Sequence, residues 1–281
     1  MIINNNIAAL NTHRQMGSVS GNAQNSMEKL SSGMRINRGA DDAAGLSISE
    51  KMRGQIRGLE QASKNSQDAV SVIQTVDGAL NESHAILQRM RELTVQAAND
   101  TNNTDERTAI QGELDELTAT LTDISTNTQF NGQKLLDASA GSGADAGVMT
   151  IQSGANSGET LTLDLRKADL ATTLADLATG MAAGVDTAAN AATSLTAIDA
   201  AIQSVSDSRA YTGAVQNRLD YTINNLNASA ENTQAAESRI RDVDMAKEMM
   251  NLTKNNILTQ ASQAMLAQAN QAPQAVLQLL R

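Results

Sequence analysis

The chain has 281 residues, a formal net charge of −10 and an aromatic content of only 1%. This acidic balance argues against a nucleic-acid-binding protein, which needs a basic surface to displace counterions from phosphates. The absence of cysteine excludes disulfides and thiolate metal sites, and two distant histidines, His13 and His84, argue against zinc. We therefore expect no metal and no cofactor. No apolar run approaches the roughly 18 residues of a membrane span.

The first predicted element is a helix that begins near the N-terminus and ends between Gly33 and Gly39. Apolar residues recur in helical spacing, as Ile3, Ile7, Leu10, Met16, Val19, Ala23, Met27, Leu30 and Met34. The first residues have no basic start followed by an apolar block, so they do not form a standard secretory signal. Taken alone, that absence favours the cytoplasm.

The stretch "SSGMRINRGADDAAGLSIS", residues 31–49, follows this helix. Asp41 and Asp42 are candidates for metal ligands or for an acid/base pair. Adjacent acids ahead of a helix are also what the free N–H groups of a helix N-terminus attract. Arg35 and Arg38 lie close enough in sequence to pair with the two acids. We therefore interpret these four residues as a helix joint held by capping and ion pairs.

A long helical pattern starts after Gly45 and runs to the polar turn "NDTNNT". At 1.5 Å per residue, such a helix extends about 75 Å, which is typical of a bundle or a coiled coil. Thr104 is a candidate N-cap for the third helix. That helix carries the cleanest stripe in the chain, Ile110, Leu114, Leu117, Leu121 and Ile124, and we expect it to fold back antiparallel.

The middle of the chain changes pattern. Asn131–Gly132 predicts a turn, and a period of two in Met149 and Ile151 and then in Leu161, Leu163 and Leu165 predicts a β-hairpin near 148–165. The Ala/Thr-rich stretch 166–192 predicts at most a short helix through Leu170, Leu174 and Leu177.

The last third is helical again, with a break at "SRIRDVDMAKE" and a final striped segment that contains Pro273, where we expect a kink or a weak turn. Narrow terminal stripes are unstable alone, so the two ends are expected to pair and to need a partner. The fold class predicted is mainly α: an elongated helical bundle or coiled coil with paired N- and C-terminal helices and a small β-hairpin. The residues predicted to drive polymerisation are Ile3, Ile7, Leu10, Met27, Leu30, Leu258, Ala261, Met265, Val276 and Leu279.

Seven blocks of this sequence resemble bacterial flagellin: "MIINNNIAALNTHRQM", "LSSGMRINRGADDAAGLSIS", "SQDAVSVIQTVDGALNESHAILQRMRELTVQAANDTN", "TQFNGQKLL", "TIQSGANSGETLTLDL", "AAESRIRDVDMAKEM" and "QAPQAVLQLLR". They cover both ends and most of the chain. The resemblance implies a structural filament subunit without enzymatic activity. It also implies an inner coiled-coil domain from 1–40 and 240–281, and a rod-like helical domain from 41–165 and 193–239. A short variable region would occupy 166–192.

The resemblance further implies export of the unfolded chain through the flagellar type III channel, which replaces the cytoplasm with an extracellular location in the filament. The partners it implies are further copies of the chain, an export chaperone on the C-terminal segment, the filament cap and the hook–filament junction proteins. The stretch "QRMRELTVQ" resembles the flagellin patch that an animal Toll-like receptor reads, with Arg89, Leu93 and Glu113 at the matching positions. Only free monomer would show that patch.

Two alternatives stay open. A hook–filament junction protein shares similar terminal motifs, although the match through "RINRGADDAAGLSIS" and "QRMRELTVQAAND" favours the filament subunit. The other alternative is an enzyme, since some flagellins are thought to carry an inserted metallopeptidase domain. The middle here is short and has no pair of histidines to hold zinc.

Overall fold

The structure is a computed structural model that describes the backbone of residues 6–137, 139–140 and 146–279, and within these ranges the side chains up to residue 271. Two compact units are present. One, here the terminal unit, comprises Met1–Gly54 and Asn232–Arg281, and the other, the central unit, comprises Gln55–Glu231. Two long helices, α2 (Ala43–Ala97) and α5 (Ala188–Arg241), contribute residues to both units.

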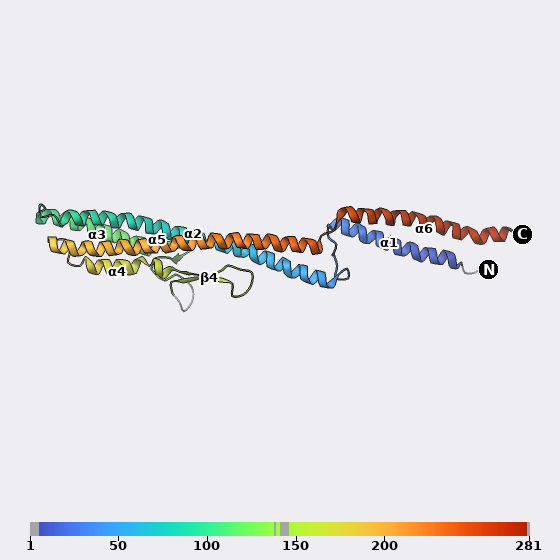
Figure 1. Cartoon of the computed structure of the whole chain (residues 1–281), viewed down its shortest axis with the longest axis horizontal. Coiled ribbons are helices and arrows are strands. Elements are labelled where there is room, and N and C mark those ends of the chain that lie inside the picture. Colours follow the sequence, from blue (N-terminus) through green and yellow to red (C-terminus); the bar gives the residue numbers. More distant parts are fainter. Residues whose placement is uncertain (1–5, 138, 141–145, 280–281) are drawn as a thin grey trace. The chain divides into compact units, whose positions relative to one another are not determined.

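The terminal unit pairs α1 (Ile7–Ser32) with α6 (Met245–Leu279), which lie side by side and antiparallel (Figure 1). At one end the side chain of Asn6 donates a hydrogen bond to the carbonyl of Ala269, at 2.7 Å. At the other end Met34 and Asp242 form an isolated antiparallel bridge. The predicted pairing of the two terminal segments is therefore confirmed.

The seam between α1 and α6 has the alternating three- and four-residue spacing of a coiled coil. Its less exposed positions are Ala9, Thr12, Met16, Val19, Ala23, Ser26 and Leu30 on α1, and Leu252, Asn255, Thr259, Ser262, Leu266 and Ala269 on α6. Most of these side chains are small or polar. The seam therefore buries little apolar area, and we expect it to stabilise the pair only modestly.

The ends of these helices follow from local sequence. Gly33, with φ of 71°, closes α1 in the left-handed conformation and donates its N–H to the carbonyl of Lys29, as a glycine C-cap does. This confirms the predicted end of the first helix. At the predicted break in "SRIRDVDMAKE", α5 ends at Arg241 and α6 begins at Met245. Helix α6 continues past Pro273 to Leu279, so the proline does not end it.

The central unit is built on α2, α3 (Thr104–Asn127), α4 (Leu170–Gly180) and α5, and Figure 1 shows α3 running back along α2. Its core contains, among others, Leu80, Leu87 and Met90 of α2, Leu114 and Leu121 of α3, Leu177 of α4, and Ile198 and Val205 of α5. The predicted α3 stripe supplies Ile110, Leu114 and Leu121 to this core, with Leu117 and Ile124 packed against it.

The predicted N-cap of α3 is wrong by one residue. The side chain of Asn103, not of Thr104, accepts hydrogen bonds from the N–H groups of Asp105 and Glu106. The Glu106 carboxylate in turn accepts the N–H of Asn103, at 3.0 Å, which completes a capping box. Asparagine and threonine both cap helices, and the sequence-based prediction named only Thr104. The signal it missed is Glu106, three residues after Asn103, which is the spacing of a capping box.

Two small hairpins complete the central unit. Strands β1 (Gln129–Phe130) and β2 (Gln133–Lys134) flank Asn131 and Gly132, which both have positive φ, as a type I′ turn requires. The sequence predicted that turn but not its strands. Strands β3 (Val148–Gln152) and β4 (Thr160–Asp164) form the predicted hairpin, in a register that pairs Met149 with Leu163 and Ile151 with Leu161.

The predicted strand residue Leu165 instead opens a short 3-10 helix, η1 (Leu165–Ala168). Helix α4 then occupies the place where the sequence allowed a short helix. The fold class is as predicted: mainly α, with paired terminal helices and small antiparallel hairpins.

Candidate functional site: the helix joint and the uncovered terminal faces

The helix joint lies wholly within the terminal unit. Asp42 caps α2: its side chain accepts a hydrogen bond from the N–H of Gly45, at 2.9 Å. This cap starts the helix at Ala43, three residues earlier than the predicted start at Leu46. A Cβ atom on Gly45 would lie 2.5 Å from the Asp42 carboxylate and 2.7 Å from the Ile36 side chain, so any larger residue there would push the capping side chain aside.

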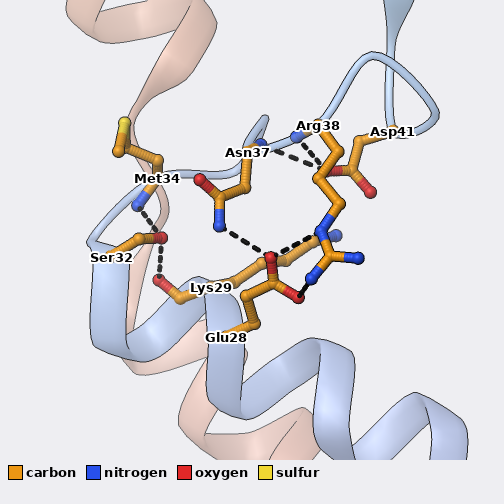
Figure 2. A network of polar contacts seen from close by, with 7 residues as sticks. All are labelled: Glu28, Lys29, Ser32, Met34, Asn37, Arg38 and Asp41. Carbon is orange, nitrogen blue, oxygen red and sulfur yellow. Dashed lines mark hydrogen bonds and ion pairs between the residues drawn. The ribbon is translucent and has the colours of Figure 1, made fainter.

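Asp41 holds the turn that precedes the helix. One of its carboxylate oxygens accepts the backbone N–H groups of Arg38, at 2.9 Å, and Asn37, at 3.1 Å (Figure 2). These backbone hydrogen bonds, that of Arg38 first, lower the pKa of Asp41 from its ordinary 3.8, because they favour the charged carboxylate. The carboxylate therefore stays ionised, and keeps holding the turn, at a lower pH than an ordinary aspartate would.

The arginines do not pair with these acids as predicted. Among the described residues, the guanidinium of Arg38 pairs with both carboxylate oxygens of Glu28 on α1, each at 2.9 Å. The side-chain amide of Asn37 donates to the same carboxylate, at 2.8 Å (Figure 2). The side chain of Arg35 donates instead to the carbonyl of Ile240. Glu28 lies ten residues before Arg38, and only the reversal of the chain after Gly33 brings them together.

The two linkers that enter and leave this joint are also tied to each other. The N–H of Arg35 donates to the carbonyl of Arg241, at 2.6 Å, and that of Val243 donates to the carbonyl of Gly33, at 3.0 Å. The guanidinium of Arg241 pairs with Glu50 near the start of α2, at 3.1 Å. Sequence reasoning missed Glu28, Glu50 and Arg241, because nothing local to them signals a partner 10 or 191 residues away.

The residues predicted to drive polymerisation lie mostly outside the α1–α6 seam. Leu30 is half-buried in the seam, whereas Ile7, Leu10, Met27, Leu258, Ala261 and Met265 are exposed. Ile3 lies outside the described residues, as do the side chains of Val276 and Leu279. We call the exposed apolar residues of α1 and α6 the uncovered faces. They are apolar surface that the chain itself does not bury.

On α6 the uncovered face includes a shallow hollow, here called the α6 hollow. It is lined by Met249, Met250, Thr253, Lys254, Ile257 and Leu258, and its exposed surface is almost entirely apolar. Opposite it on the same helix lie the small and polar seam residues that contact α1. That seam face also carries Leu252 and Leu266, and a helix with apolar side chains on both faces is typical of one buried by further partners.

The receptor-like patch lies on the central unit. Arg89 of α2 donates two hydrogen bonds to one carboxylate oxygen of Glu113 on α3, at 3.0 and 2.8 Å, and this pairing, with Glu92 close by, raises the pKa of Arg89. Both side chains are about half exposed. Leu93 points the other way: it is 3% exposed and belongs to the core. The structure thus brings two of the three predicted residues together at the surface.

Other kinds of site find little support in the part of the chain that is described. No group of three or more His, Cys, Asp or Glu side chains is placed to hold a metal ion there. Within the same residues, no helix is both long and apolar enough to cross a membrane.

Comparisons with known proteins agree with one another. The sequence model of the bacterial flagellin N-terminal helical region matches residues 3–141, and that of the C-terminal helical region matches residues 195–280. A flagellin of Halalkalibacterium halodurans is 57% identical over the whole of both chains. The flagellin of Bacillus subtilis is 55% identical, and a flagellar filament 33 kDa core protein of Treponema phagedenis 45%, again over the whole of both chains. The crystal structure of Bacillus cereus flagellin is similar at a TM-score of 0.50 and 38% identity, covering 62% of this chain and 94% of that one.

Proposed function

Because the chain belongs to the bacterial flagellin family, we infer that it is a structural subunit of the flagellar filament, the helical polymer that drives swimming. The observation that carries this function is the end-to-end match to flagellins and filament core proteins. The uncovered faces of α1 and α6 agree with it, since a polymer subunit needs apolar surface that only other copies cover. No observation favours the hook–filament junction protein.

The mechanism is mechanical. Contacts that repeat head to tail without closing build an open helical polymer. Each exposed aliphatic side chain that a neighbouring copy buries adds about 1.5–3 kcal/mol. The hydrogen bonds of the helices and the α1–α6 seam oppose most of the cost of ordering the backbone, and burial of the uncovered faces adds to them. A few such side chains on each terminal helix can therefore shift the balance between free and assembled subunits.

Different segments of the chain would form different layers of the filament. In our proposal, residues 1–40 and 240–281 form the inner layer of the filament, residues 41–165 and 193–239 the rod-like layer around it, and residues 166–192 a short variable region. The family is one of structural proteins, and we assign the chain no catalytic role. The helix joint would hold the linkers between the two layers, through Asp41, Asp42, Arg35 and Arg38.

We propose the remaining partners on the strength of the family. The chain would leave the cell unfolded through the flagellar type III channel and act outside it, and an export chaperone would first cover the apolar residues of α6. At the growing end it would meet the filament cap, and at the base the hook–filament junction proteins. The Arg89–Glu113 pair would contact an animal Toll-like receptor, with Leu93 supporting the two helices from beneath.

A truncation tests the filament function. Removing the last thirty or so residues deletes most of α6, so the chain should remain a soluble monomer in electron micrographs under conditions where the full chain forms filaments. Long filaments from the truncated chain would overturn the proposal.

A pair of single substitutions sharpens the test. Ile257→Asp places a charge in the α6 hollow and should abolish elongation. Asn256→Asp adds the same charge beside it on the same helix without removing an apolar side chain. Filaments of this variant should elongate faster than those of the Ile257→Asp variant. Equal elongation by both variants would show that the hollow is not an assembly surface.

A further inference from the structure

The methionines of this chain are segregated by exposure. Of twelve methionines, the described exposed ones are Met27, Met245, Met249, Met250 and Met265, and all five lie in the terminal unit. Met249 is 52% exposed and Met250 67%. By contrast, Met90 in the core of the central unit is 0% exposed.

The exposed thioethers lie where the proposed function needs apolar surface. Met249 and Met250 line the α6 hollow with Ile257 and Leu258. Met27 lies on the uncovered face of α1, and Met265 on that of α6. Thioethers are flexible and polarisable, which suits an adaptable contact, but they are also the part of an apolar surface that mild oxidants attack.

We propose that these five methionines form an oxidation site for hydroperoxides in the free subunit, and that their oxidation to sulfoxides stops the subunit from joining the filament. The second half of this proposal rests on the proposed function. In each reaction a sulfur lone pair attacks one peroxide oxygen, an S–O bond forms and the O–O bond breaks. The leaving hydroxide, or the alkoxide of an organic hydroperoxide, takes the proton from the oxygen now bound to sulfur and departs as water or as an alcohol. Sulfur thereby loses two electrons and the peroxide gains them.

Exposure makes the reaction selective. A hydroperoxide reaches the sulfur atoms of Met249 and Met250 without any opening of the fold, whereas it reaches Met90 only when the central unit opens. In an assembled filament the same α6 sulfur atoms would be covered by neighbouring copies. The site therefore distinguishes free subunits from assembled ones.

Oxidation also changes the chemistry of the contact. A sulfoxide is polar and accepts hydrogen bonds, and burying it in an apolar contact without a donor is unfavourable. Met249 and Met250 stand in a hollow whose lining offers little polar surface to satisfy such groups. An oxidised subunit would therefore lose affinity for the filament end while its central unit keeps its fold.

The first experiment measures the site itself. The purified full chain is treated with hydrogen peroxide, and tryptic peptides are followed by mass spectrometry over time. We expect Met249 and Met250 to gain one oxygen at least tenfold faster than Met90. Equal rates would overturn the proposal. Filaments assembled before treatment serve as a second sample, in which the rates at Met249 and Met250 should fall at least tenfold.

The second experiment measures the consequence. Oxidised chain should elongate filament seeds at least tenfold more slowly than untreated chain, and methionine sulfoxide reductases with a thiol reductant should restore the rate. A variant with all five exposed methionines changed to leucine keeps the apolar volume but has no thioether at these positions. Whatever its own elongation rate, that rate should not change on treatment with peroxide. Oxidised wild-type chain that elongates at the untreated rate would overturn this inference and leave the filament function intact. Untreated chain that never elongates would instead overturn the filament function, while the oxidation rates still decide the site.

Discussion

Arg107, in the first turn of α3, ties together two loops at one end of the central unit. One of its terminal nitrogens donates to the carbonyl of Asp186, at 3.1 Å, and the other to the carbonyl of Asn99 and the carboxylate of Asp100, each at 3.3 Å. The side chain is only 12% exposed. Arg107→Met would keep the aliphatic stem and remove all three hydrogen bonds.

The expected cost follows from these contacts. A hydrogen bond from a charged group contributes about 1.5–3 kcal/mol. Here the three bonds are long and Asp100 is highly exposed. The Nε of Arg107 is also buried with no partner among the described residues. The combined contribution of the three hydrogen bonds to stability therefore stays near that of a single good one. We expect Arg107→Met to lower the free energy of unfolding by about 2–3 kcal/mol, chiefly because two carbonyls lose their donor. At about 2–4 °C per kcal/mol, the melting temperature of the central unit should fall by about 4–12 °C.

Urea and thermal unfolding followed by circular dichroism measure this change, and Arg91→Met provides a matched control. Arg91 pairs with Asp199 at 2.7 Å, but both side chains are half exposed. Exposed pairs contribute about 0–1 kcal/mol, so the control should stay close to the wild type. Equal effects of the two substitutions would refute the reasoning, because they would show that burial and the loop carbonyls add nothing.

Three further predictions concern caps, pH and close packing. Asn103→Ala removes the capping box of α3 and should cost about 1 kcal/mol in urea unfolding, whereas no change would mean that the cap is dispensable. Asp41 has a pKa below its ordinary 3.8 in the folded chain, so its stabilising effect is present above pH 3.8 and is lost as the pH falls through the lowered value. Asp41→Asn should therefore lower stability at pH 6 and flatten its decline below pH 3.8, and an unchanged acid limb would contradict this. Gly58→Ala places a Cβ atom 2.9 Å from that of Ala155, while Gly78→Ala on the same helix meets nothing within 4 Å. The Gly58→Ala variant should therefore be less stable than the Gly78→Ala variant by about 1–3 kcal/mol in urea unfolding, and equal stabilities would refute the clash.

The sequence predicted what depends on local chemistry. Gly33 ends α1 because glycine adopts positive φ readily, and the alternation through Met149, Ile151, Leu161 and Leu163 places the β3–β4 hairpin. These features need no knowledge of distant residues. The same reasoning failed by one position where two neighbouring residues, Asn103 and Thr104, could both cap a helix.

What the sequence could not predict depends on how distant segments meet. Asp41 and Asp42 were assigned to the joint, but Arg38 pairs with Glu28 rather than with them, since the turn after Gly33 folds the chain back over α1. The terminal stripes were harder still. Both faces of α6 carry apolar side chains, so periodicity alone did not show that small residues contact α1 while larger ones stay uncovered.

The terminal unit is built from the first and the last stretches of the chain, with all of Gln55–Glu231 between them. Any process that delivers the polypeptide from its N-terminal end, such as translation, presents α1 long before its partner helix exists. The central unit can therefore fold before the terminal unit, because α1 has no partner helix until α6 has been made. A copy cut short within α6 would leave seam residues of α1, such as Val19 and Ala23, without the helix that covers them, so the terminal unit forms only in a chain that has been made through α6.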